Sequence, residues 1–186
     1  MWVDSHDVAL GRDYDRQNCS LARALEVVGE RWTILVLRDL FFGVRRFTDL
    51  RAHLDIPRAV LAERLARLMT EGVLTRTEYR RGRHEYTLTP HGRELWPTLF
   101  ALSQWGERHH SPHGRRRIFS HASCGEDLAP SGMCPRCGTL PPPEEIDIRP
   151  GPGVRHDRED AVSVALRSPH RLLTPLLADA GAGRAD

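Results

Sequence analysis

The sequence predicts a mainly α-helical domain with one small β-hairpin, an α+β fold, to which a small Cys/His knuckle is attached. Three observations predict it. Apolar residues recur with a helical period through most of residues 16–110, and the period changes to 2 over residues 73–89. Three cysteines and a histidine then gather within residues 121–140. A chain of 186 residues suits one such domain with attachments.

Four helices are expected before the hairpin, after a loose arm over residues 1–15. The first begins at Cys19 and can end at Gly29, because glycine tolerates the backbone conformation that closes a helix. A second apolar run over residues 32–42 has helical length, and a short helix follows over residues 47–54.

The fourth helix is expected from about Arg58 to Glu71, with Pro57 at its start, where the missing N–H would have no partner. Apolar side chains share one of its faces, namely Val60, Leu61, Leu65, Leu68 and Met69. The opposite face is small or charged, and it is free to meet a partner. Arg64 falls among the apolar positions, where it could pair with a carboxylate at the edge of the core instead of facing outward.

The hairpin follows directly. Residues 73–79 and 85–89 alternate as strands do, and residues 80–83 form an arginine-rich turn between them. A final helix is expected over residues 91–109. The whole unit over residues 16–110 is therefore expected to be one domain.

The chain changes character after this domain. A short basic linker is expected over residues 111–120 and a zinc knuckle over residues 121–140. Residues 141–186 are expected to be a largely flexible tail, because residues 141–153 are rich in proline and glycine. Within this tail, only residues 159–167 suggest a short helix.

Helices that lead directly into a two-stranded hairpin have the order of a winged helix-turn-helix. In this arrangement one amphipathic helix packs its apolar face on the others and leaves a free face that fits the major groove of DNA. The hairpin tip lies beside it, where arginines can contact the phosphate backbone.

Several motifs of this chain, in this order, resemble the HxlR-type winged helix-turn-helix transcriptional regulators of bacteria. They are Cys19, Val28-Gly29-Glu30-Arg31-Trp32-Thr33, Arg46-Phe47-Thr48-Asp49-Leu50, Ile56-Pro57-Arg58-Ala59-Val60-Leu61-Ala62-Glu63-Arg64-Leu65, Glu71-Gly72-Val73-Leu74 and Tyr86-Thr87-Leu88-Thr89-Pro90-His91-Gly92. The resemblance implies a homodimer that binds double-stranded operator DNA, with an interface built by residues 19–28 and 95–105. Two departures are the short wing and the C-terminal extension of some seventy residues.

Seven arginines are the candidate DNA contacts: Arg46, Arg58, Arg64, Arg67, Arg80, Arg81 and Arg83. Arg58 opens the recognition helix, where side chains reach base edges, and Arg67 is placed for a phosphate contact. The alternatives are a structural hydrogen bond for Arg46 and a buried ion pair for Arg64. The three wing arginines could instead keep the hairpin tip soluble.

His121, Cys124, Cys134 and Cys137 are the candidate metal ligands. They form two half-sites, each with two residues between its ligands, and one histidine with three cysteines suits a closed, structural Zn²⁺ site. There are two alternatives. One is a Cys134–Cys137 redox pair, although such pairs belong in a βαβ context that this chain lacks, and the other is a set of free thiols without a function. Cys19 is separate. It is a candidate redox sensor by resemblance to thiol-sensing relatives, or a buried, inert residue.

The leading hypothesis is thus a DNA-binding transcriptional regulator, and the alternative is a zinc-knuckle module that binds another protein, with thiol sensitivity. We expect no enzyme activity, because no phosphate-binding glycine loop, zinc-protease motif or nucleophile elbow is present. No stretch has the length and hydrophobicity of a membrane span, and the acidic N-terminus is no secretory signal. We therefore expect a cytoplasmic protein without a membrane partner.

Overall fold

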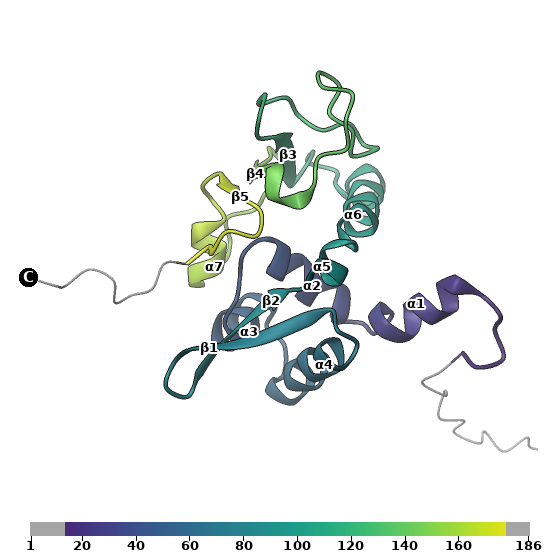
Figure 1. Cartoon of the computed structure of the whole chain (residues 1–186). Helices are drawn as coiled ribbons and strands as arrows, with labels where there is room; N and C mark the ends of the chain where they lie inside the picture. The colour runs from purple at the N-terminus through teal and green to yellow at the C-terminus, as the bar shows by residue number, and fades with distance from the viewer. Residues whose placement is uncertain (1–13, 178–186) are drawn as a thin grey trace, which may run out of the picture.

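The computed structural model describes residues 14–177, and its elements as far as residue 110 follow the order expected from the sequence (Figure 1). The first part contains α1 (Ser20–Val28), α2 (Thr33–Phe41), α3 (Phe47–Leu54), α4 (Arg58–Thr70), β1 (Leu74–Arg80), β2 (Arg83–Leu88), α5 (Pro90–Arg93) and α6 (Trp96–His110). The predicted arm, except its last two residues, and the predicted disordered end at residues 181–186 lie outside the described residues.

The turn between α3 and α4 has three residues, of which Asp55 adopts a left-handed conformation with φ of +51°. Pro57 is extended, with ψ of 137°, and immediately precedes α4, so the helix begins at Arg58. The flanking Leu54 and Ile56 are buried, which fixes the angle between the two helices. This pair is the helix-turn-helix that the sequence predicted.

The final helix of the domain is divided in two, where the sequence predicted one helix over residues 91–109. The Thr89 hydroxyl accepts a hydrogen bond from the Gly92 N–H and caps α5. Pro97 lies in the first turn of α6, where its missing N–H leaves no intrahelical bond unmade. A single helix would lose that bond in its interior, so the chain restarts at Trp96.

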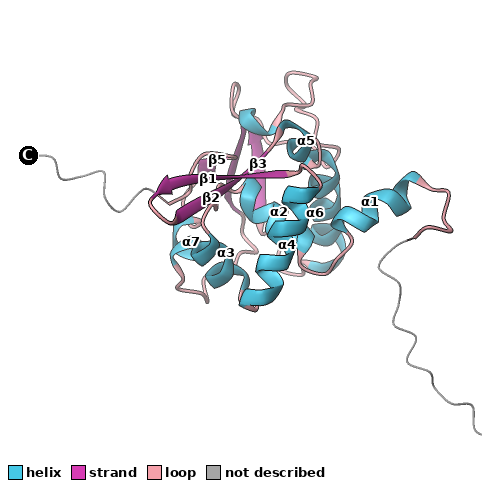
Figure 2. Ribbon diagram, turned by 60° about the horizontal axis from the view of Figure 1, so that its bottom comes forward, coloured by secondary structure: helices cyan, strands magenta, loops and turns pink. Residues whose placement is uncertain are grey.

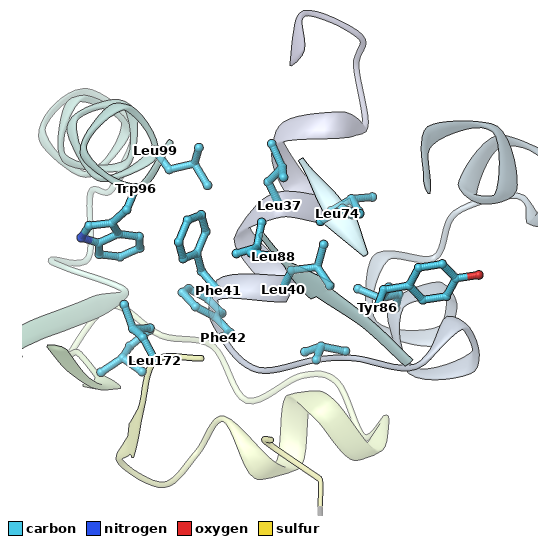
Figure 3. Close-up of a cluster of buried hydrophobic side chains, with 14 of the residues drawn as sticks. Leu37, Leu40, Phe41, Phe42, Leu74, Tyr86, Leu88, Trp96, Leu99 and Leu172 are labelled. Atoms are coloured by element: carbon cyan, nitrogen blue, oxygen red, sulfur yellow. The ribbon is translucent and has the colours of Figure 1, made fainter. Parts of the chain in front are cut away.

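The core is centred on α2, which lies between the hairpin and α6 (Figure 3). Leu37 and Leu40 are buried with the hairpin residues Leu74 and Leu88. On the other side Phe41 meets Trp96, with ring centroids 5.2 Å apart. These contacts hold α2, α6 and the hairpin in one body. By contrast, α1 projects away from the rest of the molecule (Figures 1 and 2).

The C-terminal extension is folded, which corrects two predictions. A three-stranded antiparallel sheet forms in the order β3-β4-β5. Its elements are β3 (Arg117–His121), the short 3-10 helix η1 (Pro143–Glu145), β4 (Ile146–Pro150), α7 (Ala161–Ala165) and β5 (His170–Arg171). The predicted linker over residues 111–120 thus ends in a strand, and residues 141–153, predicted to lack regular structure, contain another. The short helix expected over residues 159–167 is confirmed by α7.

Alternating burial explains why β4 forms. The proline- and glycine-rich residues around it had led to the prediction of no regular structure. Ile146 and Ile148 are both 1% exposed, while Asp147 between them points outward. Leu166 and Leu172 join the same core. Apolar burial on one face of β4 therefore outweighs the flexible composition around it.

The extension is also tied directly to the end of α2. The Leu173 N–H donates to the Phe41 carbonyl at 2.8 Å, and the Leu176 N–H donates to the Gly43 carbonyl at 3.0 Å. Gly43 has φ of +83°, and a Cβ atom there would lie 1.7 Å from the Thr174 carbonyl oxygen. Only glycine fits this close approach.

Candidate nucleic-acid interface and metal centre

Helix α4 presents one buried and one exposed face. Leu61, Leu65 and Leu68 are buried against the core, and the opposite face carries small and charged side chains: Arg58, Ala59, Ala62, Glu63 and Ala66. β1 packs against α4, so the hairpin lies beside this helix. In Figure 1 α4 and the hairpin lie at the bottom, away from β3 and β4 at the top.

Arg58 is exposed at the start of α4, with its guanidinium 5.6 Å from the centre of the Phe47 ring. A cavity of about 490 Å³ opens there between α3 and α4. Arg51, which sequence reasoning missed, lines the same cavity and is exposed. Its signal was available, because α3 precedes the recognition helix and Arg51 is a basic residue that lies beside the buried stripe of Leu50 and Leu54.

Two of the predicted arginines have protein partners. Arg64 is 9% exposed and pairs with Glu30, which precedes α2, at 3.5 Å and with Glu63 at 3.5 Å. Arg64 therefore forms the ion pair that was the alternative to a DNA contact. Arg46 pairs with Glu85 of β2 at 3.4 Å and lies 4.9 Å from the centre of the Tyr79 ring. Both side chains join elements of the domain to one another.

Arg67, on the last turn of α4, is half-buried, and its Nε has no hydrogen-bond partner among the described residues. It is therefore less accessible than Arg58. A buried N–H without an acceptor is costly, and a phosphate oxygen is one group that would supply it.

The turn at the hairpin tip is shorter than the expected turn over residues 80–83. Arg80 pairs with Arg83 across the strands, so only Arg81 and Gly82 form the loop. Gly82 supplies a φ of +71°, and its N–H donates to Glu78 Oε1 at 2.6 Å. Arg80, Arg81 and Arg83 are all exposed. The tip therefore concentrates three cationic side chains around a well-defined turn.

The four candidate metal ligands meet in the extension. One donor atom from each of His121, Cys124, Cys134 and Cys137 lies within 4.8 Å of the other three. Cys124 Sγ is 3.5 Å from Cys134 Sγ and 3.6 Å from His121 Nδ1. Both half-sites turn through a glycine in the left-handed region, Gly125 at +74° and Gly138 at +68°. The donor set and its closeness fit a tetrahedral Zn²⁺.

The thiols of this cluster differ in their pKa values. Burial of Cys134 disfavours its thiolate, but hydrogen bonds from the Cys137 N–H and from His121 outweigh it and lower its pKa to about 6. The pKa of Cys137 is raised to about 11, first by its hydrogen bond with Cys124. Several thiolates thus cannot coexist at this distance without a cation, which is the electrostatic condition that Zn²⁺ satisfies.

The histidine ring orientation fits the same interpretation. His121 Nδ1 faces the Cys124 sulfur, whereas Nε2 lies 3.4 Å from Glu145 Oε2. Metal-bound histidines commonly donate their second N–H to a carboxylate. Nδ1 is therefore the candidate ligand atom. Ser123 Oγ, 3.0 Å from Nε2, and Glu145 are the groups that hold the ring, a role that the sequence pattern did not reveal.

Cys19 is exposed and immediately precedes α1. The backbone N–H groups of Ala22 and Leu21 lower the pKa of its thiol. Cys19 is therefore not buried within the described chain, and its role as a sensor stays a prediction. All the other cysteines belong to the cluster in the extension.

Within residues 14–177, the helices are too short or too polar to cross a lipid bilayer.

Comparison with known proteins finds relatives that are all described as helix-turn-helix proteins. The HxlR-like helix-turn-helix family matches residues 27–114. The HTH-type transcriptional regulator Rv3095 of Mycobacterium tuberculosis is 43% identical over 139 residues, which cover 73% of this chain and 88% of that protein. YdeP, an HTH-type transcriptional regulator of Bacillus subtilis, is 32% identical over 106 residues, covering 54% and 83%.

Two solved structures are also similar. The transcription factor PA1607 shares 37% identity with a TM-score of 0.49, over 52% of this chain and 68% of that one. The redox regulator HypR in its reduced form shares 28% identity with a TM-score of 0.46, over 48% and 92%. Together with the residue motifs and the winged helix-turn-helix described above, the sequence comparisons show that this chain belongs to the HxlR-like helix-turn-helix family of transcriptional regulators.

Proposed function

We propose that this protein binds double-stranded operator DNA as a homodimer, with α4 in the major groove and the hairpin tip on the phosphate backbone. The exposed face of α4, beside a hairpin tip with three exposed arginines, is the observation that carries the proposal. An exposed helix face of this kind fits the major groove, and clustered arginines release counterions from the backbone.

The contacts divide by exposure. Arg58 is assigned to base edges, together with Arg51 at the same cavity, and Arg81 with its neighbours is assigned to phosphates. Arg67 is assigned to a phosphate through its partnerless Nε. Arg46 and Arg64 are given a supporting role, because their guanidinium groups are already paired inside the domain.

The homodimer is supported by apolar side chains that one chain leaves uncovered. Leu21 of α1 is 65% exposed, and Trp105 of α6 is 55% exposed. Leu25 and Leu102 extend these two surfaces. Patches of large apolar side chains commonly mark interfaces. Leu21→Glu should dissociate the dimer in sedimentation analysis, whereas Leu140→Glu, at an exposed site in the extension, should not.

A Zn²⁺ ion held by His121, Cys124, Cys134 and Cys137 would have a structural role. Cys134 belongs to the hydrophobic core, so a bound ion would join the knuckle to the folded domain. The exposed Met133 and Leu140 favour the second candidate function, in which the knuckle binds another protein. Replacing both by Ser would then abolish that binding and leave operator affinity unchanged.

Cys19 is assigned as a candidate sensor of oxidants because its thiol is exposed and its pKa is lowered. If this assignment holds, Cys19→Ser abolishes the response of DNA binding to oxidant. The proposed site of action is the cytoplasm, where the DNA target lies.

The deciding experiment is a gel shift with footprinting on genomic fragments. We expect a protected site of two symmetric halves about one helical turn apart, as two-fold related recognition helices require. Arg58→Ala should lower affinity at that site by more than its affinity for unrelated DNA. Equal binding to every fragment, with no protected region, would contradict sequence-specific operator binding.

A further inference from the structure

A cavity of about 640 Å³ lies between α2, α6 and the C-terminal extension. Its walls are mainly apolar and include Ile34 and Leu35 of α2, Trp96 and Leu99 of α6, and Phe119 of β3. This volume falls within the usual range for small-molecule sites. The proposed DNA contacts and the metal cluster do not use it, although Leu102, which extends the proposed dimer surface, also lines it.

A second cavity of about 150 Å³ adjoins the first and has a different character. The two share five lining residues, which are His53, Arg117, Val154, Arg155 and Leu166. Arg158 and Arg167 also line the smaller cavity. An apolar chamber therefore continues into a smaller one with cationic walls.

Most of the charges in these walls are already balanced. Arg158 pairs with Asp160 at 3.1 Å, Arg167 with Glu159 at 2.6 Å, and Arg155 with Asp157 at 2.9 Å. These pairs leave little charge to recruit a ligand.

In the larger cavity, Arg38 pairs with Asp39 at 2.6 Å, and Asp39 also lies 2.7 Å from His53. Among the described residues, Glu107 is the one carboxylate on the wall of the larger cavity. Its Oε1 accepts from the Arg116 N–H, and its buried Oε2 has no hydrogen-bond partner among those residues.

Arg117 is the exception. It lies on the wall common to both cavities and donates to the Leu166 carbonyl at 2.6 Å, but within the described residues no carboxylate lies at ion-pair distance. Burial lowers the pKa of its guanidinium, which means that its positive charge is poorly compensated. A partly buried cation without a counterion favours the binding of an anion beside it.

We propose that the two cavities form one binding site for an organic anion. The ligand has an apolar part about the size of an aromatic ring system, and its anionic group pairs with Arg117. The apolar part occupies the larger chamber between α2 and α6. The anionic group lies at the shared wall, where Arg117 donates hydrogen bonds to it.

The test uses the purified full-length protein without DNA, so its result does not depend on the proposed operator binding. The probe is 8-anilinonaphthalene-1-sulfonate, which is an apolar ring system with one sulfonate, followed by its fluorescence. N-phenyl-1-naphthylamine has the same rings without the sulfonate and is the matched neutral probe. We expect saturable binding of both probes with one site per chain.

Arg117→Gln should weaken the anionic probe by about tenfold, or about 1.4 kcal/mol, and leave the neutral probe within about twofold. Arg76→Gln, on the exposed face of β1, removes the same charge elsewhere and should change neither. Val154→Trp, which fills the junction of the cavities, should abolish binding of both probes, and it gives an answer if the Arg117 variant does not fold.

Three outcomes would overturn the proposal. The first is equal affinity of the anionic probe for the Arg117→Gln variant and the parent protein. The second is saturable binding that Val154→Trp leaves unchanged, which would locate the probe elsewhere. The third is no saturable binding to the parent, as expected if a second copy of the chain fills the larger cavity.

Discussion

Removing charge from the hairpin tip should change how DNA binding depends on salt. Arg81 and Arg83 are exposed, and neither has an ion pair within residues 14–177. Their replacement by Gln therefore breaks no described ion pair of the fold. Gly82 and the Glu78 contact that shape the turn remain in place. The double variant should keep its thermal stability and lose only phosphate contacts.

The size of the effect follows from counterion release. Each phosphate contact contributes about 0.9 to the slope of log affinity against log salt. Two arginines on each of two hairpins make four contacts, so the slope should decrease by about 3.6. When the salt concentration rises from about 50 to about 200 mM, both proteins lose affinity. The fold-loss of the double variant should therefore be roughly a hundred times smaller than the fold-loss of the parent.

Fluorescence anisotropy with a labelled operator fragment at several salt concentrations measures this slope. Arg108→Gln with Arg115→Gln removes the same charge from exposed sites at the end of α6 and in the extension and serves as the control. The control slope should stay close to that of the parent. A double hairpin variant with the parent slope would refute the assignment of the tip to the backbone, whatever its affinity at a single salt concentration.

Four further predictions concern the fold and the metal. Gly43→Ala should lower stability by at least about 1–2 kcal/mol because of its left-handed backbone, and melting by circular dichroism should show this while Gly106→Ala, which meets open space, does not. Arg64→Gln should lower the urea midpoint by breaking the Glu30 pair, whereas a direct DNA contact would instead reduce affinity at unchanged stability. Protein purified without added metal should contain one zinc per chain by elemental analysis, and a chelator should lower its melting temperature; three freely titratable thiols without zinc would exclude the site. Burial lowers the pKa of His170, so the folded state favours its neutral ring, and stability present above pH 6.5 should be lost on acidification; urea unfolding of His170→Gln should show a smaller loss between pH 7.5 and 5.5 than the parent.

The winged helix-turn-helix could be predicted because its signals are local. The apolar face of α4 is set by spacing along one helix, and the alternation over β1 and β2 predicts the hairpin directly. The metal cluster is also local along the chain. Each ligand pair is short, and only ten positions separate Cys124 of the first pair from Cys134 of the second. Such contacts need little information from distant parts of the chain.

The sequence alone thus determined the helix order, the arginine-rich tip and the four donors, because each depends on residues that are close along the chain. Tertiary structure decided the rest. Arg64 and Glu30 meet only after α4 packs beside the loop before α2, and Gly43 meets Thr174 across 131 positions. Burial in a folded core, which composition cannot report, turned residues 146–150 into a strand and left Arg117 without a carboxylate partner in the described chain. Long-range packing chooses between roles that residue type leaves open, because burial and counter-charge are properties of the assembled molecule.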